Sequence, residues 1–70
     1  MKTKYAIHIF WSEEDEGFIA ICDEFPGLSA FGETREEALG EAQIALDATI
    51  ETYQASGLAI PEPQSMLLAA

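Results

Sequence analysis

The stretch TREEALGEAQIALDATIETYQAS, residues 34–56, decides the fold, because it is the one long segment with a regular apolar spacing. At 100° per residue its apolar stripe fits within an arc of about 140°. The stripe consists of Ala38, Leu39, Ala42, Ala45, Leu46, Thr49, Ile50 and Tyr53. Thr34 and Glu37 have the spacing of a capping box, and Gly57 is suited to end a helix. The pattern predicts an amphipathic helix over about residues 35–56.

Three segments before the helix are rich in β-branched and aromatic residues, which is typical of strands. The predicted strands are residues 4–11, 17–23 and 28–32. The tail, residues 57–70, contains an apolar run at residues 66–69 that is a candidate for a short closing strand. A chain of 70 residues has room for one domain, residues 1–70. We therefore expect an α+β fold of the type β-β-β-α(-β), in which one helix covers one face of an antiparallel sheet.

The composition is strongly acidic: 13 Asp and Glu residues against 3 Lys and Arg residues give a net charge of −10. Such a charge disfavours direct binding to nucleic acid or anionic membranes, and it either suits a basic partner or merely promotes solubility. The single Cys22 excludes an internal disulfide and fits a reducing compartment. The sequence has no secretory signal and no apolar run approaching about 20 residues. We therefore expect a cytoplasmic protein.

The first two predicted strands carry large apolar side chains on both faces, although one helix can cover only one face of a sheet. The other face needs a second copy of the chain, another protein or the C-terminal tail to cover it, and the edge strands offer a further contact. We expect a homo-oligomer, a dimer or a tetramer. Candidate residues for the contact with itself or with a partner lie on the sheet face or edge and on the helix. They are Tyr5, Ile7, Ile9, Trp11 and Ile44.

The sequence gives little support for catalysis or metal binding. His8 has no carboxylate at a spacing that would orient it, and Cys22 lies in an apolar segment, where a free thiol is usually inert. The acidic run 13–16 is better explained as a solvated hairpin tip than as a cation site. Asp23 and Glu24 are a weak candidate for paired carboxylates. We therefore expect no catalytic residues, no cofactor and no metal.

From Gly17 the chain reads GFIAICDEFPGL, and Gly32-Glu33-Thr34 leads into the Ala-rich helix. With the acidic hairpin before Gly17 and the segment IPEP after the helix, this order and spacing resembles the HicB-like family, the antitoxin half of HicAB toxin–antitoxin systems. The resemblance runs from about Tyr5 to Pro63. The residues that match the family motif, together with the glutamate of the capping box, are expected to form the fold and not to catalyse. These are Gly17, Pro26, Gly27, Gly32, Thr34 and Glu37.

The resemblance implies a truncated RNase H-like sheet with one helix, in a domain that is not regarded as a nuclease. Family members bind and neutralise HicA, a small basic toxin that cleaves RNA, and they commonly self-associate. Typical members continue into a C-terminal DNA-binding segment, for which these 70 residues leave no room. Direct operator binding is therefore not expected.

Three functions remain open. The first is an antitoxin-type module whose acidic surface steers a basic toxin into apolar contacts that mask it. The second is a stand-alone oligomeric domain that binds another protein or a small ligand. The third, a residual two-metal nuclease, needs carboxylates that converge from different elements, whereas the acids of the predicted helix point outward.

Overall fold

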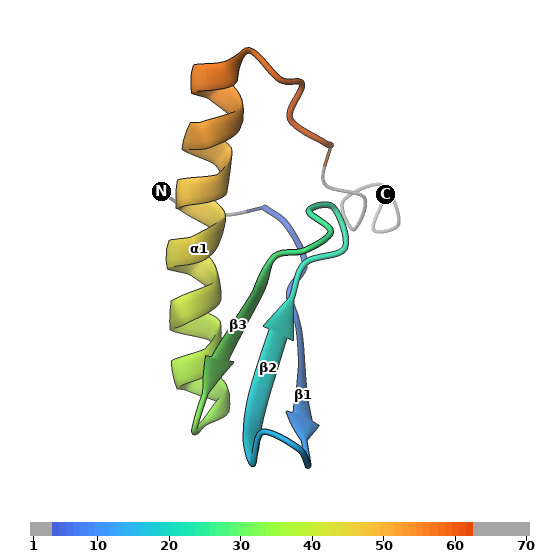
Figure 1. Ribbon diagram of the computed structural model, residues 1–70, viewed down its shortest axis with the longest axis vertical. Coiled ribbons are helices and arrows are strands. Elements are labelled where there is room, and N and C mark those ends of the chain that lie inside the picture. The colour runs from blue at the N-terminus through green and yellow to red at the C-terminus, as the bar shows by residue number, and fades with distance from the viewer. Residues whose placement is uncertain (1–3, 63–70) are drawn as a thin grey trace.

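The computed structural model describes residues 4–62. Three strands are followed by one helix, and the strands form one antiparallel sheet in the order β1-β2-β3. Figure 1 shows this order, with α1 along one side of the sheet. The elements are β1 (His8–Ser12), β2 (Gly17–Ile21), β3 (Ser29–Gly32) and α1 (Arg35–Ser56). The predicted α+β architecture of three strands and one helix is confirmed, whereas the RNase H-like relationship stays a prediction.

The strands are shorter than the sequence predicted. In the register of the first hairpin Ser12 is opposite Gly17 and His8 is opposite Ile21, so pairing stops where β2 stops. Residues 4–7 have no partner strand beyond that point, because Cys22 already belongs to a turn. The first strand therefore begins at His8 instead of residue 4. The predicted closing strand at 66–69 lies outside the described residues.

Two consecutive turns connect β2 to β3. The amide of Phe25 donates to the carbonyl of Cys22 at 3.1 Å, and the amide of Leu28 donates to the carbonyl of Phe25 at 3.0 Å. The second turn has Pro26 at its second position and Gly27, with a φ of 93°, at its third. A type II turn needs this combination, since only glycine adopts a positive φ there without strain. The turns fold Phe25 back into the core, where it is 2% exposed.

Both ends of α1 are capped. The hydroxyl of Thr34 accepts from the amide of Glu37 at 3.0 Å, as the capping box predicts. The carboxylate of Glu37 accepts from the amide of Glu33 at 2.8 Å, one residue earlier than in the standard box. At the other end Gly57 adopts a φ of 72°, and the amides of Gly57 and Leu58 donate to carbonyls of the last turn in the pattern of a Schellman motif.

The core lies between α1 and the sheet in two parts. Near the helix start small side chains allow a close approach, because Ala20, Ala38 and Ala42 are almost fully buried. Toward the helix end the core consists of larger side chains. This second cluster consists of Cys22, Phe25, Leu46 and Ile50, with Tyr5, Leu28 and Tyr53 packed against it. The ring of Phe25 makes edge-to-face contacts with those of Tyr5 and Tyr53, at centroid distances of 5.2 and 5.3 Å.

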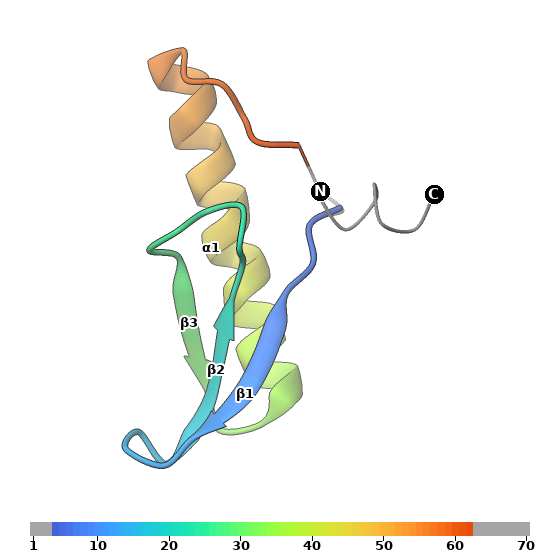
Figure 2. The same cartoon turned by 90° about the vertical axis from the view of Figure 1, so that its right-hand side faces the viewer.

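The helix leaves one whole face of the sheet bare. It packs mainly against β3 and β2 and only lightly against β1. In Figure 2 the helix lies behind the sheet, and no other described element covers the face toward the viewer. Within residues 4–62, no helix is both long and apolar enough to cross a membrane.

Candidate partner-binding surface

An apolar row crosses the bare face of the sheet, which we call the outer face. The register places Phe10 opposite Ile19 and Ile19 opposite Phe31, so the three side chains stand in one line across all three strands. Phe10 is 47% exposed and Phe31 is 43% exposed. Two bulky aromatic side chains so exposed on one sheet face are typical of a protein-binding surface.

The close fit of the outer face depends on Gly17. A Cβ at this position would lie 2.3 Å from Cε1 of Phe31, so the absence of a side chain is what allows the Phe31 ring to lie there. Gly17 belongs to the fold-forming motif predicted from the sequence, and this contact gives a physical reason for a glycine there. Gly17 therefore leaves open the space that the ring of Phe31 occupies.

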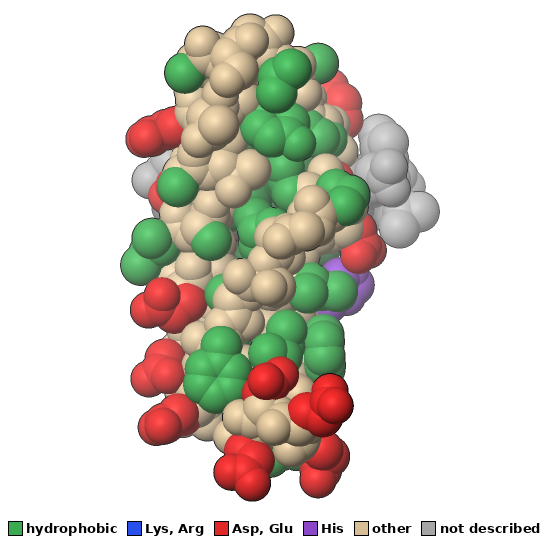
Figure 3. All heavy atoms as spheres, viewed as in Figure 1, with side chains coloured by type: hydrophobic (Ala, Val, Ile, Leu, Met, Phe, Trp, Pro, Cys, Tyr) green, Lys and Arg blue, Asp and Glu red, His purple; other side chains and the backbone are tan. Residues whose placement is uncertain are grey.

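Acidic side chains flank the apolar surface. The exposed hairpin tip, Glu13 to Glu16, closes one end of the sheet, and further acids line the exposed side of α1. In Figure 3 hydrophobic side chains run along the middle of the visible face, acidic ones lie at its sides and lower end, and no Lys or Arg side chain is visible. This charge distribution is electrostatically complementary to a basic protein surface.

The five predicted contact residues do not lie on one surface. Tyr5, Ile7 and Ile9 point to the helix side of the sheet and are half-buried against the two core clusters. Trp11 is 49% exposed near the free edge of β1, and Ile44 is 67% exposed on the far side of α1. A role in partner contact stays a prediction for all five. Phe10, Ile19 and Phe31 were not among the predicted contact residues, because the alternation of side chains along a strand does not indicate which face the helix covers.

Trp11 belongs to a second, smaller aromatic group. The Trp11 ring packs edge-to-face on the Phe18 ring, with the ring centroids 5.2 Å apart. The guanidinium of Arg35 lies over the Phe18 ring, 4.8 Å from its centroid. The indole N–H of Trp11 donates to a carboxylate oxygen of Glu13 at 2.7 Å. The exposed tryptophan is therefore held in place beside the hairpin.

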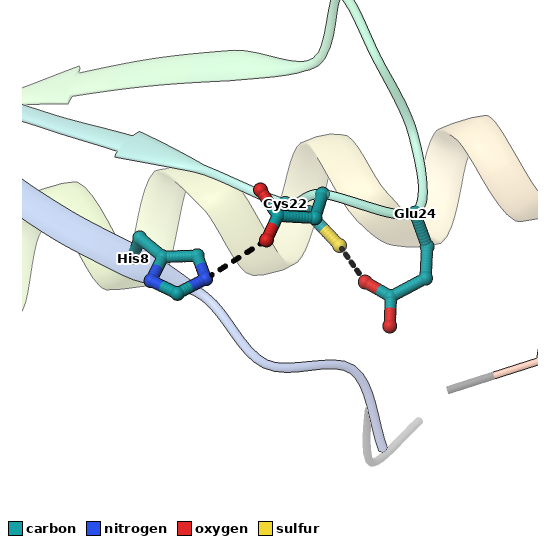
Figure 4. Close-up of polar contacts among 4 residues, drawn as sticks. His8, Cys22 and Glu24 are labelled. Carbon is teal, nitrogen blue, oxygen red and sulfur yellow. Dashed lines mark hydrogen bonds and ion pairs between the residues drawn. The ribbon is translucent and has the colours of Figure 1, made fainter. Parts of the chain in front are cut away.

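The expectation that His8 lacks an orienting carboxylate was wrong. Its Nε2 lies 3.2 Å from Oδ2 of Asp23, because the register brings the end of β2 beside the start of β1. Figure 4 draws this contact as the dashed line that starts at His8. The two side chains are 57% and 71% exposed, so the pair lies in solvent and not in a cleft. Of the two neighbouring carboxylates, Asp23 thus contacts His8, and Glu24 accepts a hydrogen bond from the thiol of Cys22 at 3.5 Å.

Cys22 has the properties of a structural thiol. Burial raises its pKa above the ordinary value of 9.0, and this effect prevails although a hydrogen bond from the Glu24 backbone lowers the pKa. The thiolate, which is the nucleophile, is therefore disfavoured at neutral pH. Cys22 is only 3% exposed, so a reagent or substrate would also have poor access to it.

The acids do not gather into a metal centre in the described part of the chain. Among residues 4–62, no group of three or more His, Cys, Asp and Glu side chains is placed to hold a metal ion. A hollow lies on α1 and is lined by Asp47, Ile50, Glu51 and Gln54. Of the acids it contains only Asp47 and Glu51, which are too few to form a metal centre by themselves. The strongest feature of the surface is thus the apolar row on the outer face.

Comparison with known proteins agrees with a binding role. Residues 4–68 match the family described as HicB-like antitoxin of bacterial toxin–antitoxin systems. The chain belongs to this family. The match extends over nearly the whole chain, as the resemblance predicted. No curated protein and no solved structure matches the chain significantly.

The family motif has clear structural roles here. Gly32 is buried at the point where β3 meets α1, and a Cβ there would lie 2.2 Å from the backbone nitrogen of Ala38. Pro26 and Gly27 form the turn before β3, and Thr34 and Glu37 cap the helix. In this HicB-like chain the motif therefore fixes how closely the helix and the sheet approach each other.

Proposed function

We propose that this chain is an antitoxin-type binding module, which neutralises a small basic, RNA-cleaving toxin of the HicA type by covering its RNA-binding surface. Membership of the HicB-like antitoxin family supports the class of partner. The observation that carries the proposal is the apolar row Phe10–Ile19–Phe31 on a sheet face that the helix does not cover. Because such a toxin acts on RNA, the encounter would take place in the cytoplasm.

The proposed binding uses two kinds of interaction, long-range electrostatic attraction and short-range apolar contact. The net charge of −10 accelerates the approach of a basic protein over a distance of several ångströms. The apolar row then supplies the short-range contacts that keep the two proteins together. Masking requires no catalysis by the antitoxin, which agrees with an inert Cys22 and with a His8–Asp23 pair that lies in solvent.

The test begins with a search beside the gene for this chain for one that encodes a small basic protein, and it then asks whether this chain protects RNA from that protein. That protein is purified, and cleavage of a labelled RNA is measured with increasing amounts of the acidic chain. We expect protection at about a one-to-one ratio, and weaker protection at 0.5 M salt because salt screens the attraction.

A pair of matched variants locates the contact. Phe31→Lys places a charge in the apolar row, and it should raise the amount of chain needed for protection roughly tenfold or more. Gln43→Lys adds the same charge on the exposed side of α1 and should leave protection nearly unchanged. Loss of protection in Ile44→Lys but not in Phe31→Lys would move the contact to the helix. If neither the neighbouring protein nor any other small basic protein binds, the toxin role is wrong.

The alternative is a stand-alone oligomeric domain that binds some other protein or a small ligand. The same bare apolar face is compatible with it, since any protein partner could cover that face. A stable complex with a neutral or acidic protein, insensitive to salt, would favour this alternative.

A further inference from the structure

We propose that Trp11, Glu13 and Phe18, which we call the Trp11 corner, bind an arginine side chain of a basic partner. The guanidinium stacks on the indole ring of Trp11 and donates hydrogen bonds to the carboxylate of Glu13. The sequence predicted Trp11 only as a contact residue and left the chemistry of the contact open. The identity of the partner rests on the proposed function, whereas the recognition of arginine is tested without any toxin.

The indole ring of Trp11 is exposed, and yet its orientation is fixed. The side chain is 49% exposed on β1, which is an edge strand of the sheet. Its edge-to-face contact with Phe18 and its hydrogen bond to Glu13, at 2.7 Å, both restrict rotation of the ring. A large side chain that is already held in place loses little conformational freedom when a partner binds. The exposed surface of the indole is therefore preorganised for a contact.

An arginine of the chain itself already lies on the neighbouring ring. Trp11 is opposite Phe18 in the register of the first hairpin, at the end of the sheet where α1 begins (Figure 1). The guanidinium of Arg35 lies 4.8 Å from the centroid of the Phe18 ring. A guanidinium is planar and stacks on aromatic faces, and tryptophan attracts a cation more strongly than phenylalanine does. The ring that attracts a cation more strongly is thus the exposed one of the pair.

The carboxylate of Glu13 gives the corner its preference for a cation. The hydrogen bond from the indole N–H holds this exposed carboxylate at the edge of the Trp11 ring. A carboxylate has two oxygens with several lone pairs, so Glu13 can accept from a guanidinium while it still accepts from the indole. The hairpin tip around it is ordered, because the hydroxyl of Ser12 donates to the carboxylate of Asp15 at 2.9 Å. An aromatic face and a fixed negative charge thus lie side by side.

The Trp11 corner lies within reach of a partner that covers the outer face. Phe10 and Trp11 are consecutive in β1, so their side chains lie on opposite faces of one edge strand. The helix packs only lightly against β1, and both side chains are exposed. A partner on the outer face can therefore extend around the free edge of β1 and place one long basic side chain on Trp11.

The test uses the single tryptophan of the chain, whose indole N–H gives one signal in the NMR spectrum of the isotope-labelled protein. The probe is the tripeptide glycine-arginine-glycine with both ends blocked, and its lysine counterpart of equal charge is the matched control. We expect the arginine peptide to shift the Trp11 signal to saturation and to bind roughly threefold or more tightly than the lysine peptide, because a guanidinium stacks and an ammonium does not. Equal dissociation constants, or no shift of the Trp11 signal, would overturn the proposal.

Matched variants separate the contribution of the ring from that of the charge. Trp11→Leu keeps an apolar side chain without an aromatic face, and it should weaken binding of the arginine peptide roughly fivefold, followed by the amide signals of β1. Trp11→Phe keeps an aromatic face and should weaken binding less. Glu13→Gln should weaken binding roughly threefold, whereas Glu14→Gln removes the same charge one residue away and should have a smaller effect. Equal effects of the two glutamine variants would contradict a direct contact with Glu13.

The arginine corner and the toxin role can fail separately. If no toxin exists, the peptide titration still decides whether the corner recognises arginine. If the chain protects RNA but the arginine peptide does not shift the Trp11 signal, the proposed function holds and the arginine corner is wrong. If both hold, Trp11→Leu should raise the amount of chain needed for RNA protection roughly threefold or more, because it removes one contact of the interface.

Discussion

The backbone of Gly32 lies against the first turn of α1, and this contact sets the distance between helix and sheet. A Cβ at this position would be 2.2 Å from the nitrogen and 2.7 Å from the Cα of Ala38, two backbone atoms that no side-chain rotation can move. Gly32→Ala must therefore push the helix away from β3 and open the alanine-lined part of the core. We expect the free energy of unfolding to fall by about 3 kcal/mol or more, measured by urea unfolding. A loss below about 1 kcal/mol would show that the helix shifts without cost.

Gly40 offers the opposite case inside the same helix. A Cβ there meets no atom within 4 Å, and the position has no positive φ that would demand glycine. Gly40→Ala removes backbone freedom from the unfolded chain, so it should raise the free energy of unfolding by about 0.5–1 kcal/mol. Urea unfolding of this variant is also the control for Gly32→Ala, because both changes add one methyl group. Destabilisation by Gly40→Ala would contradict this expectation.

The thiol of Cys22 makes stability depend on pH at the alkaline end. Burial raises its pKa in the folded state, so above the ordinary value of 9.0 the unfolded thiol ionises while the folded one still holds its proton. The unfolded state then binds fewer protons, and the free energy of unfolding falls as pH rises. Burial also raises the pKa of Tyr5 above 10.0, which extends the decline.

The measurement is urea unfolding at intervals between pH 7 and pH 10.5. Cys22→Ala should start from a lower free energy of unfolding, because the side chain is buried, and should show a shallower decline above pH 9. Tyr5→Phe should flatten only the part near and above pH 10. Equal slopes in the wild type and Cys22→Ala would show that the thiol does not contribute.

At the scale of single elements, the helix could be predicted more closely than the strands. Its ends are set by local chemistry, since Thr34 and Gly57 cap it from within the chain, and both signals are visible in the sequence. A strand ends where its partner ends, and that depends on the register. β1 begins at His8 because its partner β2 stops at Ile21, which no local signal around Lys4 could indicate.

The N-cap of α1 provides a test at this scale. Thr34→Ala removes the hydroxyl that accepts the amide of Glu37, and it should lower the free energy of unfolding by about 1 kcal/mol. Thr52→Ala is the matched control, because the exposed hydroxyl of Thr52 only donates a hydrogen bond to the carbonyl of Ala48 within the same helix. Alanine has the higher helix propensity there, so the control should be neutral or slightly stabilising in thermal and urea unfolding. Equal losses in the two variants would contradict the role of the cap.

At the scale of the whole molecule, the sequence could predict that an apolar face stays bare, but not which residues form it. Alternation places Ile9 and Phe10 on opposite faces with equal apolar character, and only the packing of α1 decides between them. The same limit explains the unexpected His8–Asp23 pair. These residues are distant in the chain, and the hairpin register brings them together.

The unbalanced charge of the whole chain leads to the last prediction. All 13 acids lie within residues 4–62, and in that range neither Lys4 nor Arg35 forms an ion pair. Salt therefore removes repulsion between carboxylates in the folded state and has few attractive pairs to weaken. We expect the free energy of unfolding to rise by about 1 kcal/mol between 0.05 M and 0.5 M NaCl, because screening shortens the range of the repulsion.

Urea unfolding at fixed protein concentration measures this effect, and a variant with two fewer charges provides its control. Glu41→Gln combined with Glu51→Gln neutralises two exposed acids of α1, away from the cap and the core. The variant should be more stable than the wild type at low salt and should gain less from added NaCl. If salt stabilises both proteins equally, the gain comes from stronger apolar burial and not from screened repulsion.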